Sequence, residues 1–126
     1  MAQALGIGGF FFRSPDREAL CRWYASNLGL EIDETWWGTS IEWAKQHDAA
    51  NAQTVWSVFK GDTTYFGGAD RAFMVNFRVR DLDAMLKQLR DNGCAVEDKV
   101  EDSDFGRFGW VTDPDGNRVE LWQPPA

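Results

Sequence analysis

The sequence is poor in the residues that hold metal ions, cross-link chains or bind nucleic acids. It contains one histidine, two cysteines, and 13 lysines and arginines against 20 aspartates and glutamates, so its formal net charge is −7 at pH 7. The one histidine, His47, falls in a polar loop expected at 46–53, with no ligand partner at a useful spacing. An acidic chain suits neutral or cationic small molecules better than the phosphate backbone, which attracts clustered basic residues. We therefore expect a small-molecule partner and no nucleic acid.

Long hydrophobic runs and targeting signals are also missing. No apolar stretch approaches the roughly 20 residues that cross a bilayer. The start MAQALGIGGFF lacks the charged region and the small-residue cleavage site of a signal peptide. Cys21 and Cys94 form no CxxC or CxxH pattern, so we expect reduced thiols, and neither has a histidine partner for nucleophilic catalysis. These absences predict a cytoplasmic protein that does not bind membranes.

The chain is rich in aromatic side chains. Its 126 residues are enough for one domain with a hydrophobic core, and they include seven tryptophans and nine phenylalanines. Alternation along the expected strands must send some of these rings into the core. The number of rings still indicates a pocket for a flat apolar or amphipathic molecule, bound by stacking and apolar burial.

The stretch FGRFGWVTDPDGNRVELWQP, residues 105–124, predicts a β-hairpin. Two runs rich in β-forming residues, 107–112 and 118–122, would be its strands. Pro114 favours a turn between them, and Gly116 can take the positive φ that closes the hairpin. This hairpin organises the rest of the chain.

Glu120, in the second of these strands, is the first candidate for a functional residue. Strict alternation places it on one face with Arg118 and Trp122. Burying a carboxylate is costly unless it is paired. Glu120 would then be a general base or an anchor for a ligand cation or hydroxyl. The alternative is a structural ion pair with Arg78, Arg107 or Arg118, and the sequence leaves both roles open.

The first half of the chain predicts one helix between strands. Residues 4–13 form the first expected strand. Ser14 as N-cap and Pro15 at the first helical position would begin the helix, and Gly29 would end it in a left-handed conformation. Further extended runs, separated by a turn at Gly38 and the polar loop, are expected at 30–37, 40–45 and 54–60.

The second half repeats this order. Residues 72–79 predict a strand, and Asp81 can cap a helix that Gly93 ends. An extended run, 94–100, then leads through an acidic loop, 101–104, to the hairpin. Each half therefore has the order β-α-β-β-β, which indicates an internal repeat.

The repeat predicts an α+β fold with a single domain, residues 1–126. Two tandem βαβββ modules, at about 1–62 and 70–126, would form a half-open, cup-shaped mixed β-sheet with the helices outside. The inner face of such a cup is concave and pre-formed, so it is the expected ligand site.

Three stretches carry a resemblance to a known family. The segments NLGLEI, FRVRDLDAML and above all VTDPDGNRVELWQP resemble the vicinal oxygen chelate superfamily, which includes glyoxalase I, bleomycin-resistance proteins and extradiol dioxygenases. The resemblance spans nearly the whole chain. It implies paired βαβββ modules and a homodimer.

The resemblance also implies a divalent metal site, and the sequence departs from that site at most positions. Glu120 matches the glutamate ligand of the last strand. The two histidine positions fall on Gly9 and Met74, and the remaining position falls on Trp56 or Ser57. A single carboxylate does not supply the several converging donors that a divalent ion needs. We therefore expect no metal and no cofactor.

These observations favour a small-molecule-binding protein of the glyoxalase/bleomycin-resistance type with a degraded metal site. It would bind an aromatic or amphipathic compound in the cup, beside Glu120. The alternative is a glyoxalase-like lyase or isomerase that uses Glu120 as a general base or as a metal ligand. A third hypothesis is a structural partner whose cup closes only in a dimer. The expected ligand-binding residues are Trp43, Trp56, Met74, Asn76, Arg78, Phe108, Trp110 and Trp122.

Overall fold

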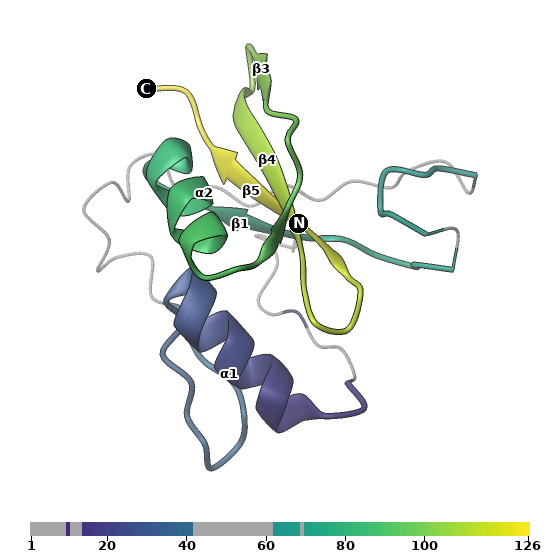
Figure 1. Ribbon diagram of the computed structural model, residues 1–126, viewed down its shortest axis with the longest axis vertical. Helices are drawn as coiled ribbons and strands as arrows, with labels where there is room; N and C mark the ends of the chain where they lie inside the picture. Colours follow the sequence, from purple (N-terminus) through teal and green to yellow (C-terminus); the bar gives the residue numbers. More distant parts are fainter. Residues whose placement is uncertain (1–9, 11–13, 42–61, 69) are drawn as a thin grey trace, which may run out of the picture.

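The computed structural model describes residues 10, 14–41, 62–68 and 70–126 (Figure 1). Two helices and five strands lie in this part of the chain. In chain order they are α1 (Arg17–Leu28), β1 (Val75–Arg78), α2 (Leu82–Asp91), β2 (Ala95–Val96), β3 (Glu101–Ser103), β4 (Gly106–Thr112) and β5 (Arg118–Gln123). Neither helix is long and apolar enough to span a membrane, among the residues described.

The five strands form one mixed sheet in the order β1-β5-β4-β2, and β3 also pairs with β4. The β1–β5 pair is parallel, and the other pairs are antiparallel. Both helices pack on one side of this sheet (Figure 1). The expected α+β class is confirmed. The division into two βαβββ modules remains a prediction, because the expected strand at 54–60 and most of those at 4–13 and 40–45 lie outside the described residues.

The core lies between the helices and one face of β4 and β5. Its buried members are Leu20, Tyr24, Leu82, Leu86, Leu89, Val111, Val119 and Leu121. The helical members recur at the three- and four-residue spacing of one helix face, and the β5 members at the two-residue spacing of one strand face. Gly109 allows α2 to come close to β4, because a Cβ at this position would lie 3.1 Å from a methyl group of Leu86.

Helix α1 begins two residues later than expected. Asp16, rather than Ser14, is the N-cap, and its carboxylate accepts a hydrogen bond from the backbone N–H of Ala19 at 3.1 Å. The hydroxyl of Ser14 instead accepts from the N–H of Asp16. Aspartate and serine are both good N-caps, so the local sequence alone did not separate them.

The remaining helix boundaries agree with the sequence prediction. Asp81 caps α2 through a hydrogen bond from the N–H of Ala84 at 3.0 Å. Gly29 and Gly93 follow the two helices with φ of 70° and 76°. Glycine takes this left-handed conformation at low cost, so both helices end where expected.

Two segments differ from the prediction. Residues 30–37 do not form the extended run expected there, because a turn closes from Asp33 to Gly38 through the Asp33 N–H and the Gly38 carbonyl at 2.8 Å. The Asp33 carboxylate stabilises this turn by accepting from the hydroxyl and the N–H of Thr35. The acidic loop expected at 101–104 is largely strand β3, whose residues pair with the start of β4. Pairing with a neighbouring strand overrides the low strand propensity of its acidic residues.

The turn between β4 and β5 is organised by Asp113, which is 4% exposed. Its carboxylate accepts hydrogen bonds from the backbone N–H groups of Asp115 and Asn117 and from the side-chain amide of Asn117. The predicted positive φ at Gly116 is confirmed at 83°. The fourth donor is the hydroxyl of Tyr24 on α1, at 3.0 Å, so this turn also anchors the first helix.

The Tyr24–Asp113 contact should contribute measurably to stability. Burial and the neighbouring carboxylate raise the pKa of Tyr24 well above its usual range, so the phenol keeps the proton that it donates. We expect Tyr24→Phe to lower the free energy of unfolding by about 2 kcal/mol, because a hydrogen bond to a charged group is lost. Urea unfolding followed by circular dichroism measures the change. Asp91→Ala, which breaks the exposed Lys87–Asp91 pair, should stay within about 0.5 kcal/mol of the wild type. Equal stabilities for wild type and Tyr24→Phe would contradict this role.

Candidate functional site

The face of the sheet opposite the helices gathers most of the residues that the sequence singled out. Glu120 lies in β5 directly between Asn76 of β1 and Trp110 of β4. Trp122 lies in the same way between Arg78 of β1 and Phe108 of β4. Directly paired residues on neighbouring strands point to the same face of a sheet. The structure therefore brings together Glu120, Asn76, Arg78, Phe108, Trp110 and Trp122.

Glu120 is buried, with 7% of its surface exposed. Its Oε1 accepts a hydrogen bond from the side-chain amide of Asn76 at 2.8 Å. Its Oε2 accepts from the indole N–H of Trp110 at 3.0 Å and from the hydroxyl of Tyr65 at 2.5 Å. A buried carboxylate is tolerated when donors of this kind replace its water. These contacts make Glu120 a fixed acceptor at the centre of the face.

Tyr65 is the functional candidate that sequence reasoning missed. It lies in the connector 62–68, which has no helix or strand and precedes β1 in the chain. Its ring meets that of Trp110 edge-on, with centroids 6.0 Å apart. Burial and the hydrogen bond to Glu120 raise the pKa of Tyr65 above its usual range, so the phenol stays protonated. No local pattern could have identified Tyr65, because its partners lie 45 or more residues away in the chain.

Arg118 locks this arrangement. Its guanidinium makes a two-pronged ion pair with Glu97, with N–O distances of 2.7 and 2.8 Å. It also lies 4.6 Å from the ring centroid of Trp110 and 5.1 Å from that of Tyr65, and it donates to the Tyr65 carbonyl. Cation–π contact and the ion pair together fix both rings. The structure thus pairs Arg118 with Glu97, whereas the sequence left it as a possible partner of Glu120.

The other arginines considered as partners of Glu120 are also placed. Arg107 forms ion pairs with Asp83 and Asp102, at 3.1 and 2.8 Å. Arg78 lies two residue pairs along the β1–β5 ladder from Glu120, opposite Trp122. The three hydrogen bonds to Glu120 that the structure describes come from uncharged donors.

The second aromatic pair lies at the far end of the same face. The rings of Phe108 and Trp122 are nearly parallel, at 6° with centroids 6.1 Å apart. Trp122 donates its indole N–H to the carbonyl of Phe105 at 2.8 Å, which fixes its ring plane. Phe108 is half-buried, whereas Trp122 is only 5% exposed.

Two expected site residues, Trp43 and Trp56, lie outside the described residues, as does His47. Met74 is described, and it directly precedes β1 in a half-buried position. Cys21 and Cys94 are free thiols whose pKa values burial raises, which disfavours the reactive thiolate. Their geometry gives no support to nucleophilic catalysis by either cysteine.

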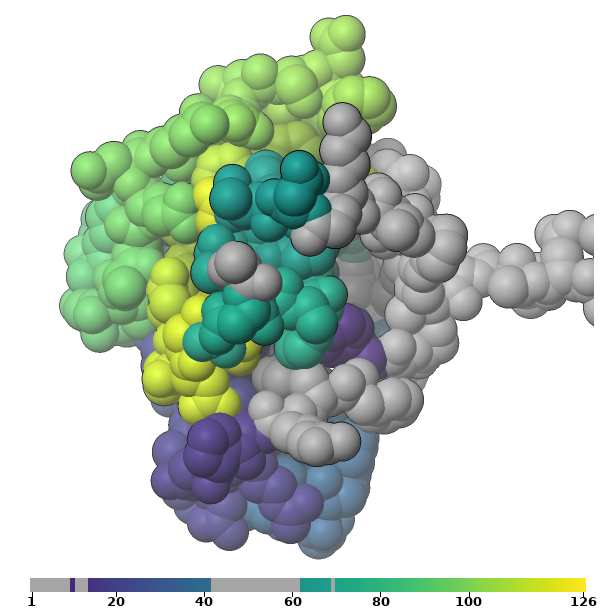
Figure 2. Space-filling view, turned by 90° about the vertical axis from the view of Figure 1, so that its right-hand side faces the viewer, coloured from purple at the N-terminus to yellow at the C-terminus, as the bar shows by residue number. Residues whose placement is uncertain are grey.

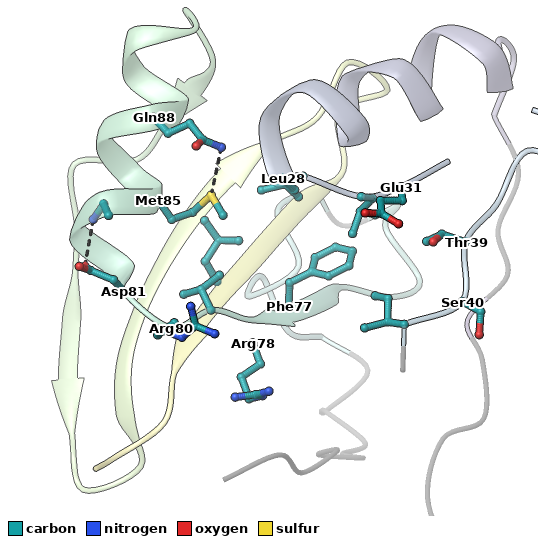
Figure 3. A pocket seen from close by; sticks show the side chains of 16 residues that line it. Leu28, Glu31, Thr39, Ser40, Phe77, Arg78, Arg80, Asp81, Met85 and Gln88 are labelled. Carbon is teal, nitrogen blue, oxygen red and sulfur yellow. Dashed lines mark hydrogen bonds between the residues drawn. The ribbon is translucent and has the colours of Figure 1, made fainter. Parts of the chain in front are cut away.

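A cavity lies on the other side of the sheet, beneath the helices. Its volume is about 540 Å³, within the range of small-molecule sites. Figure 3 shows Phe77 projecting into it between Leu28 and Met85, with Glu31 and Arg80 at opposite sides. Glu120 is not among its lining residues. The cavity and the Glu120 face are therefore different sites, although Arg78 at the end of β1 borders both.

The face around Glu120 is closed in this structure. Trp110 is 1% exposed, and residue 65 lies over it. Figure 2 shows the teal chain segment that begins at residue 62 at the surface on this side, next to yellow residues of the C-terminal hairpin. On the Trp110 side, an aromatic compound could reach Glu120 only if this connector shifted.

Comparison with known proteins identifies the family. The sequence profile described as Glyoxalase/Bleomycin resistance protein/Dioxygenase superfamily matches residues 6–121. The chain belongs to this superfamily. This result confirms the resemblance seen in the sequence.

Three solved structures share the fold. TnmS3, an antibiotic binding protein from Streptomyces sp. CB03234, is 24% identical and is matched over 99% of both chains with a TM-score of 0.58. Oxidase ChaP-H2 is 18% identical over 89% of this chain and 87% of its own, with a TM-score of 0.52. A superfamily member from Sphaerobacter thermophilus DSM 20745 is 21% identical over 86% and 88%, with a TM-score of 0.50. At these identities the likeness concerns the fold alone.

Other comparisons add less. The chain spans 48%, 46% and 37% of the length of three further solved structures, which include a glyoxalase/bleomycin resistance protein from Streptomyces sp. CB03234. Their TM-scores lie between 0.36 and 0.39. No curated protein matches the chain.

The described residues do not fit the metal ion that enzymes of the glyoxalase superfamily hold. The indole of Trp110 is a donor only, and a hydroxyl proton and an amide N–H occupy the other positions that Glu120 faces. In the part of the chain that the structure describes, no three histidine, cysteine, aspartate or glutamate side chains cluster as ligands. Gly9, Trp56 and Ser57 lie outside that part.

The Glu97–Arg118 pair predicts a pH dependence. Hydrogen bonds from Arg118 lower the pKa of Glu97. A carboxyl group whose pKa is lower in the folded than in the unfolded state stabilises the fold at pH values above its unfolded pKa, about 4.3 for glutamate. This stabilisation is lost as the pH falls from there through the folded pKa. We expect the free energy of unfolding to fall less between about pH 6 and pH 3 in Glu97→Gln than in the wild type, because glutamine does not titrate. Urea unfolding at each pH measures the difference. Glu34→Gln, at an exposed turn, is the control, and its stability should depend on pH as that of the wild type does. If the stability of Glu97→Gln also depended on pH as that of the wild type does, the stabilising role of the Glu97–Arg118 pair would be excluded.

Proposed function

We propose that this member of the superfamily is a metal-free receptor for an aromatic or amphipathic small molecule, bound on the Glu120 face of the sheet. The observation that carries the proposal is the placement of one buried carboxylate among aromatic rings on a single sheet face. Rings supply apolar contact area, and one fixed acceptor supplies orientation. This combination is typical of small-molecule sites.

The geometry supports Glu120 as an anchor rather than as a general base. Both of its oxygens already accept hydrogen bonds from Asn76, Trp110 and Tyr65. A general base needs a free lone pair aimed at the substrate proton. A carboxylate fixed by several donors is instead suited to accepting a hydrogen bond from a ligand that takes the place of one of them. TnmS3, described as an antibiotic binding protein, shows that the fold can be used for binding.

The proposed receptor also has an expected compartment and oligomeric state. We propose a cytoplasmic homodimer, in which the half-open sheet of each subunit is completed by its partner. Two free thiols and the acidic composition are compatible with a reducing compartment. Light scattering of the purified protein tests the assembly, and a monomer at micromolar concentration would exclude this part.

Ligand binding should depend on the Glu120 face and not on the cavity under the helices. We expect Phe108→Ala to weaken binding of planar aromatic compounds about tenfold, because an aromatic contact is lost. Met85→Ala removes a side chain of similar apolar character from the cavity lining and should leave affinity unchanged. Titration of a panel of compounds with two or three fused rings, followed by tryptophan fluorescence, measures both. A loss of binding in Met85→Ala alone would move the site to the cavity, and silence across the panel would refute the receptor.

Binding should not require a divalent metal. We expect protein purified without added metal to contain no stoichiometric divalent ion by mass spectrometry, and its affinity for the best panel compound to be the same in EDTA. The physical reason is that N–H and O–H donors surround Glu120 where a metal site needs converging lone pairs. A tightly held ion at one per chain, lost together with binding in EDTA, would establish a metal-dependent protein instead.

A further inference from the structure

Tyr65 occupies the Glu120 face in the manner of a bound aromatic ligand. Its hydroxyl donates to Glu120, its ring meets the edge of Trp110, and the guanidinium of Arg118 lies over its π-face. Tyr65 thus contacts the hydrogen-bond acceptor of the site, an aromatic ring and a cation. Its side chain shows that a phenol fits this face of the sheet.

The segment that carries Tyr65 can act as a unit. Residues 62–68 belong to no helix or strand. The N–H of Tyr65 donates to the hydroxyl of Thr63, and the N–H of Gly67 donates to the carbonyl of Thr64, so these hydrogen bonds join residues of the same turn. Gly67 has a φ of 100°, which glycine adopts without strain. A turn held by its own hydrogen bonds can keep its shape when it shifts.

We propose that Tyr65 is a built-in stand-in for the ligand, and that the Glu120 face binds phenolic aromatic compounds, whose hydroxyl replaces that of Tyr65 on Glu120. This inference rests on the proposed receptor function and names its ligand class. Tyr65 then competes with the ligand from within the same chain. The apparent affinity is reduced by the fraction of molecules in which Tyr65 occupies the site.

The charges around the site select a neutral hydroxyl. Glu120 repels a carboxylate or a phosphate and attracts a hydrogen-bond donor. Arg118, whose charge is balanced by Glu97, makes a cation–π contact with the face of an aromatic ring. A phenol satisfies both, because its O–H donates to the acid while its ring lies under the guanidinium. The raised pKa of Tyr65 shows that a phenol at this position keeps its proton.

The ligand class is tested with 2-naphthol and 2-methoxynaphthalene, which share a ring system and differ in the donor. Binding is followed through the indole N–H resonance of Trp110 in labelled protein, assigned with Trp110→Phe. We expect the wild type to bind 2-naphthol about tenfold or more tightly than the methoxy compound, because only the phenol donates to Glu120. Equal affinities would overturn the phenol preference and leave the aromatic receptor standing. Absence of binding by both compounds, in wild type and in Tyr65 variants, would refute the receptor itself.

The stand-in role is tested with Tyr65→Phe and Tyr65→Ala. Both should bind 2-naphthol more tightly than the wild type, since the internal competitor is weakened in the first and removed in the second. Tyr65→Phe keeps the ring, so it remains informative if Tyr65→Ala fails to fold. Thr64→Ala, at an exposed position of the same turn, should bind like the wild type. Weaker binding in Tyr65→Phe would overturn the proposal, because Tyr65 would then be part of the wall that holds the ligand.

A rescue experiment adds a second readout. The side chain of tyrosine corresponds to p-cresol, so p-cresol should raise the melting temperature of Tyr65→Ala while toluene at the same concentration should not. The same p-cresol should raise the melting temperature of Tyr24→Phe by less, because Tyr65 still occupies the site in that variant. Equal stabilisation by p-cresol and toluene would show that the vacated space has no use for a hydroxyl and would overturn the phenol site.

Discussion

The burial of Glu120 in the middle of β5 is the constraint on which the rest of the sheet face depends. A carboxylate removed from water must regain its hydrogen bonds inside the protein, and here uncharged donors from three different segments supply them. Each donor fixes a neighbour: Asn76 fixes the register of β1, Trp110 the wall of the face, and Tyr65 the connector. The arrangement leaves an acceptor whose position is determined on every side.

The same hairpin contains a second buried acid, Asp113, in the turn between β4 and β5. Asp113 in the turn and Glu120 in the strand each receive the hydroxyl of a tyrosine that is distant in the sequence, Tyr24 and Tyr65 respectively. The Tyr24–Asp113 contact holds helix α1 against the hairpin, and the Tyr65–Glu120 contact holds the connector over the Glu120 face. Two acids of one hairpin thereby position two segments that are distant in the sequence. In both contacts, burial raises the pKa of the tyrosine, so the phenol keeps its proton.

Local signals in the sequence sufficed for the helix and the hairpin of the second half. The hairpin strands, the positive φ at Gly116, the Asp81 cap and the alternation that places Glu120 beside Trp122 all follow from residues within a few positions of one another. The contacts that complete the face do not. The Glu97–Arg118 pair and the Tyr65–Glu120 bond join residues 21 and 55 positions apart, and strand β3 exists only because β4 lies beside it. Propensity and period carry no information on such partners, so the sequence identified the anchor and missed its companions.

The central position of β5 in the sheet affects how this protein folds during its synthesis. Strand β5 lies between β1 and β4, yet it follows every other described element in chain order. A nascent chain emerging from the ribosome therefore exposes the apolar faces of both helices and the edge of β1 that pairs with β5 until residues 118–123 have been made. The described sheet can therefore close only once β5 is available, and an unfinished chain with these faces exposed is prone to aggregation.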